Sequence, residues 1–82
     1  MSTNPDGPFR ADDELITLLS RWLARHVGDQ ELRVRMEAIG VVALSADQGE
    51  AVDELLQELD RGTSRGDLEM VVRETIEALA LG

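Results

Sequence analysis

The residues best placed to do chemistry in this chain are carboxylates. Four of them recur at three- and four-residue intervals in a stretch, residues 45–60, that holds no basic residue: Asp47, Glu50, Glu54 and Glu58. A helix advances about 100° per residue, so these side chains would share roughly 80° of its circumference. Such a stripe attracts a cationic protein surface, whereas hydrolases need carboxylates that face one another across a cleft. The pattern therefore favours binding over catalysis.

Other side chains that commonly support catalysis or metal binding are scarce. The chain has no cysteine and a single histidine, His26, without a second ligand or a nucleophile at a matching spacing. The serines lack the histidine and acid partners of a catalytic triad. Calcium sites use looped backbone carbonyls in addition to carboxylates, so the acidic stripe alone is a poor cation site. We expect no catalytic, cofactor-binding or metal-ligating residue and no enzyme, with His26 partly buried in the last turn of a helix.

The negative charge is concentrated in the second half of the chain. The formal net charge is −9 and the sequence pI is near 4.3. Counting Asp and Glu against Arg gives 7 − 5 = 2 net negative charges for residues 1–44 and 10 − 3 = 7 for residues 45–82. This balance opposes binding to nucleic-acid phosphates, which depends on cationic side chains. It favours a basic partner, whose approach the same field would accelerate.

The elements that position these residues are predicted to be helices. Residues 1–10 contain both prolines and read as a flexible arm, with Phe9 as a staple against the first helix. Acidic residues open a helix over residues 12–27, and Gly28 would close it in the left-handed conformation. Apolar residues, Trp22 among them, cover nearly half its circumference. Either this helix is central to the bundle or a partner covers part of its apolar surface.

Residues 30–44 admit two interpretations. Helical spacing places apolar residues on one face, and Asp29 could cap a helix that Gly40 would kink. This face comprises Leu32, Met36, Ile39 and Ala43. The β-branched content of residues 39–44 instead suits a hairpin that pivots near Gly40. We favour a helix, because an isolated two-stranded hairpin is marginally stable and the flanking segments are strongly helical.

The second half contains the two clearest helical patterns. Ser45 and Gln48 have the spacing of a capping box, which starts a helix over residues 46–61 that stops at Gly62. The last helix, over residues 67–80, has the most regular apolar spacing in the chain. Met70 lies off its apolar stripe, either as an ordinary exposed residue or as part of a patch shared with a second copy.

Together these patterns predict an all-α fold, a compact four-helix bundle-like domain over residues 11–82 with a short flexible N-terminal arm over residues 1–10. The predicted function is protein–protein interaction with a basic surface on another protein, with homodimerisation as an option. No cofactor is expected. The contact residues that we expect are Asp47, Glu50, Glu54, Glu58, Trp22 and Met70.

Two other functions fit the same features less well. A small acidic helical body suits an inhibitor that neutralises a basic active site, such as an antitoxin, an immunity protein or a nucleic-acid mimic. A dimeric helical regulator could instead meet DNA through arginines of the first two helices: Arg21, Arg25, Arg33 and Arg35. The net charge argues against that role. The lack of cysteine and of an apolar run of about 20 residues predicts a cytoplasmic protein without a membrane segment.

Overall fold

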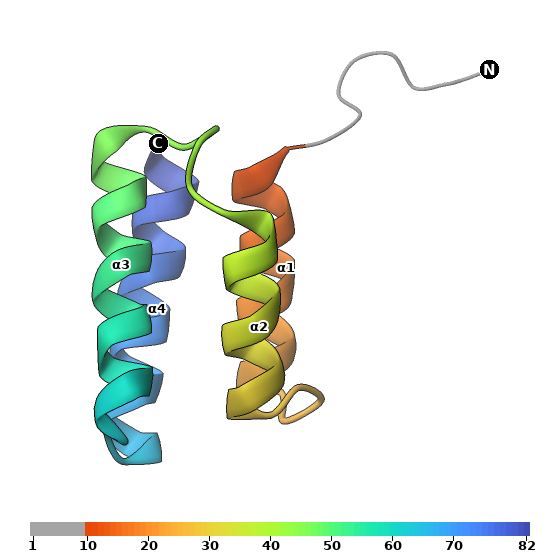
Figure 1. The fold of residues 1–82 in the computed structure, drawn as a ribbon, viewed down its shortest axis with the longest axis vertical. Coiled ribbons are helices and arrows are strands. Elements are labelled where there is room, and N and C mark those ends of the chain that lie inside the picture. Colours follow the sequence, from red (N-terminus) through yellow and green to blue (C-terminus); the bar gives the residue numbers. More distant parts are fainter. Residues whose placement is uncertain (1–9) are drawn as a thin grey trace, which may run out of the picture.

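Four helices account for most of the chain (Figure 1). The computed structural model describes residues 10–82, and within that range it contains no strand. This confirms the predicted all-α, four-helix bundle-like class and excludes the hairpin over residues 32–44. In chain order the helices are α1 (Ala11–Leu23), α2 (Asp29–Ile39), α3 (Ala46–Arg61) and α4 (Arg65–Leu81).

The helices form two hairpins, α1 with α2 and α3 with α4. α1 packs against both α2 and α4, and the most extensive contact is between α3 and α4. α2 touches α3 at only a few points. In Figure 1, α3 lies in front of α4 and α2 lies in front of α1, with a gap between the two front helices. α1 and α4 therefore form the centre of the bundle. This position explains the wide apolar arc of α1, which is covered from two directions inside the domain.

Apolar side chains at three- and four-residue spacing on each helix meet in one core. The core is mostly aliphatic, and among residues 10–82 its one aromatic side chain is that of Trp22. Each fully buried Leu or Val contributes about 1.5–3 kcal/mol relative to exposure. The residues at the centre are Leu15, Leu19, Trp22, Leu32, Met36, Val52, Leu55, Leu68, Val72 and Leu79.

α3 begins and ends at the predicted residues because both of its ends carry local signals. The Ser45 side chain accepts the Gln48 backbone N–H, and the Gln48 side chain accepts the Ser45 backbone N–H, which completes the capping box. Gly62 closes the helix in the left-handed conformation, with φ 74° and ψ 32°. The buried Gln48 amide also donates to the Leu79 carbonyl at 2.9 Å. The capping residue thus connects the start of α3 to the end of α4.

α1 is shorter than predicted and ends at Leu23 instead of Val27. Arg25 adopts the left-handed conformation, with φ 67°, and takes the position usually filled by glycine. The Arg25 N–H bonds to the Trp22 carbonyl and the His26 N–H bonds to the Arg21 carbonyl, both at 2.9 Å, which is the Schellman pattern. Gly28 is instead the extended residue that precedes α2. His26 consequently lies beyond the helix and is exposed, so the prediction of a partly buried helical His26 was wrong.

α2 ends at Ile39, five residues before the predicted end. Gly40 does not kink the helix but terminates it, because its φ of 75° and ψ of −178° belong to a region that is essentially restricted to glycine. The following residues form an exposed connection, in which Val42 is 98% exposed. Ala43, predicted on the buried face, is exposed as well, whereas Leu44 turns back against the core.

α4 starts at Arg65, two residues earlier than predicted. The predicted arm and the Phe9 staple lie outside the described residues, except for Arg10. Within residues 10–82, no helix combines the length and the apolar character that crossing a bilayer requires.

Three helices meet at the Trp22 side chain. Its indole N–H donates to the Asp29 carboxylate of α2 at 2.7 Å. The Arg65 guanidinium of α4 lies 4.0 Å from the centre of the indole ring and donates to the Trp22 backbone carbonyl at 2.9 Å. Glu69 accepts from the same guanidinium at 3.1 Å, one turn further along α4. A cation–π contact and two hydrogen bonds thus join α1 to α2 and α4.

Two substitutions of Asp29 distinguish the effect of its hydrogen bond to Trp22 from the effect of its negative charge. Asp29→Ala leaves the indole N–H with water as its only acceptor, and we expect a loss of about 1–2 kcal/mol. The melting temperature, followed by circular dichroism, should fall by about 5–10 °C. Asp29→Asn keeps an acceptor oxygen and should lose less than half as much. Equal losses in the two variants would mean that the carboxylate charge at the start of α2 matters more than the hydrogen bond.

The end of α1 offers a second test of the fold. Arg25→Gly removes the steric cost of a side chain in the left-handed region, and this gain exceeds the added backbone entropy of the unfolded chain. We expect stabilisation by about 0.5–1 kcal/mol, or a melting temperature about 2–6 °C higher. The control Arg21→Gly removes the same charge inside α1 and should destabilise by about 1 kcal/mol. A decrease in both variants would contradict the structural role assigned to Arg25.

Candidate functional site

Four exposed carboxylates cover the solvent side of α3. They lie opposite the buried stripe of this helix and, together with Ala51 and Gln57, outline a depression in the surface. We call this the acidic face and define it by Asp47, Glu50, Asp53 and Glu54. The helix holds them in fixed positions because both of its ends are capped and because Val52 and Leu55 anchor its inner side. Asp53 joins three of the predicted residues and extends the face around the helix.

The acidic face has no cationic neighbour in the described chain. None of the ion pairs within residues 10–82 includes one of its four carboxylates. Two arginines pair with other carboxylates of α3: Arg33 of α2 pairs with Asp60, and Arg61 pairs with Glu58. Within residues 10–82, the four charges thus have no partner at ion-pairing distance.

Glu58 is set apart from the acidic face. Its side chain is only 22% exposed, and its two oxygens accept from Arg61 at 3.0 Å and from the Thr63 hydroxyl at 2.6 Å. The backbone N–H of Thr63 also bonds to the Glu58 carbonyl. Glu58 thus stabilises the end of α3, which leaves it poorly available for a partner.

The two apolar residues predicted as contacts are not part of the acidic face. Trp22 is completely buried, so a partner cannot reach it in this conformation. Its prediction as a surface contact rested on the wide arc of α1, which α2 and α4 cover. Met70 is 60% exposed on α4 and does not line the acidic face. Its role in contact with a partner or with a second copy stays a prediction.

His26 and the carboxylates do not converge on a metal centre. In the range from Arg10 to Gly82, no three side chains of the histidine, cysteine, aspartate and glutamate types lie close enough to hold an ion.

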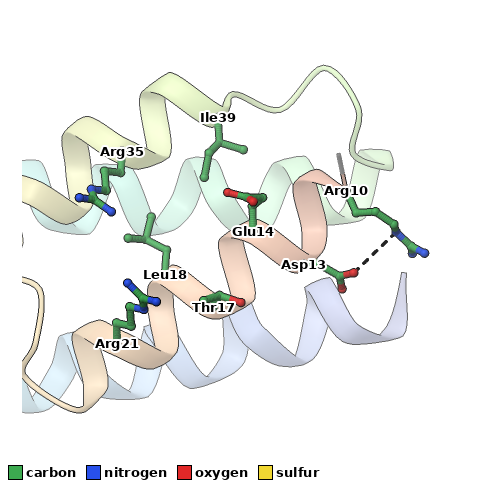
Figure 2. Close-up of a pocket in the computed structure, with 8 residues that line it drawn as sticks. All are labelled: Arg10, Asp13, Glu14, Thr17, Leu18, Arg21, Arg35 and Ile39. Carbon is green, nitrogen blue, oxygen red and sulfur yellow. Dashed lines mark ion pairs between the residues drawn. The ribbon is translucent and has the colours of Figure 1, made fainter. Parts of the chain in front are cut away.

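A second concave feature lies between α1 and α2 (Figure 2). It is a groove of about 360 Å³, and Leu18 and Ile39 provide its apolar surface. Figure 2 shows Arg21 of α1 and Arg35 of α2 extending toward each other at one end, with Leu18 between them. Its lining residues are Arg10, Asp13, Glu14, Thr17, Leu18, Arg21, Arg35 and Ile39.

The groove was not predicted from the sequence, although two of its arginines were noted as a candidate nucleic-acid contact. The structure separates the four arginines of that set. Arg21 and Arg35 line the groove, whereas Arg33 is paired with Glu37 and Asp60, and Arg25 lies in the turn after α1. The pairing of α1 with α2 is what brings Arg21 and Arg35 together.

Comparisons with models of protein families, with curated proteins and with solved structures found no match to this chain.

Neutralising one charge of the acidic face should stabilise the protein. Glu54 lies four residues from both Glu50 and Glu58, and each like-charge pair at this spacing costs a few tenths of a kcal/mol. We expect Glu54→Gln to gain about 0.5 kcal/mol, or about 2–4 °C in melting temperature at low salt. The gain should shrink in 1 M NaCl, where the screening length falls to about 3 Å.

The matched control is Glu77→Gln on α4. It removes the same charge, but Glu77 lies four residues after Arg73, which attracts it, and three residues after Glu74, which repels it, so the two effects oppose each other. We expect no gain from this variant. Equal stabilisation by both substitutions would show that net charge matters, and not the arrangement of carboxylates on α3.

Proposed function

We propose that this protein is a non-catalytic binding module that docks a basic surface of another protein onto the acidic face of α3. The observation that carries the proposal is the absence of any ion pair to Asp47, Glu50, Asp53 and Glu54 within residues 10–82. Each of these side chains is exposed. The face is therefore open to arginine or lysine side chains of a partner.

The physical reason is relief of repulsion between like charges. Glu50 lies three residues after Asp47, and Glu54 lies four residues after Glu50, so these carboxylates are neighbours on the helix surface. A cationic partner would remove this repulsion and form charge-assisted hydrogen bonds. Because the helix is held at both ends, its backbone is already ordered, and the entropy lost on binding would be that of the carboxylate side chains.

The net charge of −9 supports the same proposal through the rate of encounter. A field of one sign accelerates the approach of an oppositely charged protein and slows the approach of nucleic acid and of other acidic proteins. The cysteine-free composition fits a reducing compartment, and we propose that the partner is met in the cytoplasm.

The test compares two triple variants with the same net charge. In the first, three of the four carboxylates of the acidic face are neutralised, by Asp47→Asn, Glu50→Gln and Glu54→Gln. In the second, α4 is neutralised by Asp67→Asn, Glu74→Gln and Glu77→Gln. The immobilised proteins are incubated with lysate of the source cell at 50 mM salt, and the retained proteins are identified by mass spectrometry after elution at 500 mM salt.

We expect a basic protein that the wild type and the α4 variant retain and that the α3 variant loses by at least tenfold. Its binding to the purified wild type should weaken as salt rises, because the contact is between opposite charges. Retention of the same proteins by both triple variants would exclude the acidic face as the docking surface. Melting curves of both variants establish that the fold is intact.

A further inference from the structure

The groove between α1 and α2 is lined by side chains that the proposed function does not use. It is formed by α1, its preceding residue Arg10 and α2, whereas the acidic face belongs to α3 alone. Its volume of about 360 Å³ lies at the lower end of the range for small-molecule sites, which is roughly 300–1,000 Å³. The two features are therefore independent.

One end of the groove is suited to an anion. Arg21 and Arg35 line it from different helices, and Figure 2 shows both side chains at the same end, with Leu18 between them. Arg35 has one partner, Glu31, at 2.8 Å on its own helix. Arg21 forms no ion pair with any residue between Arg10 and Gly82. Two guanidinium groups that line the same end of a groove repel each other, and a bound anion between them would offset this repulsion.

The remainder of the groove restricts which anion fits. Leu18 lies on its floor, only 5% exposed, and Ile39 is partly buried, and these two side chains contribute the apolar surface of an otherwise polar groove. Glu14 is two turns before Arg21 on α1, about 10 Å along the helix axis. Its carboxylate opposes a second negative charge at that end. A ligand with one charged end and an apolar body fits this arrangement better than a multiply charged phosphate.

We propose that the groove binds a small organic monocarboxylate, with its carboxylate between Arg21 and Arg35 and its apolar body over Leu18 and Ile39. The planar guanidinium group is suited to bidentate contacts with a carboxylate, which a lysine cannot reproduce. A second copy of the protein would fit less well, because the apolar floor is recessed below a charged rim and a flat surface would not reach it.

The test uses hexanoate as the probe and backbone amide chemical shifts as the readout. Hexanoate is titrated into the ¹⁵N-labelled protein beside acetate, which lacks the apolar body, and 1-hexanol, which lacks the charge. We expect saturable shifts from hexanoate for amides of residues 14–21 and 35–39. Acetate and 1-hexanol should bind at least fivefold more weakly. Equal binding of 1-hexanol, or saturable shifts confined to other helices, would overturn the proposal.

Three variants locate the charged end. Arg21→Gln and Arg35→Gln should each weaken hexanoate binding at least fivefold. Arg73→Gln removes the same charge from the exposed side of α4 and should change binding less than twofold. Unchanged binding in the two groove variants would overturn the assignment.

Thr17→Glu provides a check that does not remove an arginine. Thr17 is exposed on the groove, and a glutamate there would lie four residues before Arg21, where it can pair with the guanidinium group. The new carboxylate would occupy the place of the ligand and improve the helix, so binding should be lost while the melting temperature is maintained. Hexanoate binding at wild-type strength in a folded Thr17→Glu protein would contradict the site.

Discussion

The packing of the bundle depends on the contacts of one tryptophan. Trp22 is the largest side chain in the core, and its polar groups are used by two other helices: Asp29 of α2 accepts the indole N–H, and Arg65 of α4 donates to the backbone carbonyl. That carbonyl would bond to the His26 N–H if α1 continued. Because Arg25 takes the left-handed conformation, His26 bonds to Arg21 instead, and the Trp22 carbonyl accepts from both Arg25 and Arg65. The left-handed Arg25 thus both ends α1 early and leaves the Trp22 carbonyl able to accept from Arg65 of α4.

The ends of the helices show what could be predicted from the sequence. α3 was predicted to the residue because Ser45, Gln48 and Gly62 act on backbone groups within a few positions of themselves. The end of α1 had no such signal, since arginine rarely takes the conformation that Arg25 adopts. Gly40 was recognised as unusual, but its φ and ψ decide between a kink and a stop, and they depend on the path of the chain toward α3.

The sequence likewise predicted the part of the candidate site that lies on one helix, but not the parts that depend on the turn after α3 or on two paired helices. Exposure of Asp47, Glu50 and Glu54 follows from helical periodicity, because they lie opposite a buried apolar stripe. Glu58 is not part of the acidic face because it accepts from the Thr63 hydroxyl, and this hydrogen bond requires the turn after α3. The groove depends on Arg21 and Arg35, which are fourteen residues apart and meet because α1 and α2 pair. Local patterns therefore predicted surfaces within one helix and missed those made by two.

α2 is attached unevenly to its two neighbouring helices, α1 and α3. α2 is the shortest helix, and its link to α3 consists of a few contacts and the Arg33–Asp60 ion pair between exposed side chains. Such pairs contribute about 0–1 kcal/mol and weaken with salt. The turn after α1 and the glycine at position 40 bound this helix on either side. α2 is therefore held in the bundle mainly by its pairing with α1 and by its buried Leu32 and Met36, whereas its contact with α3 adds little to that attachment.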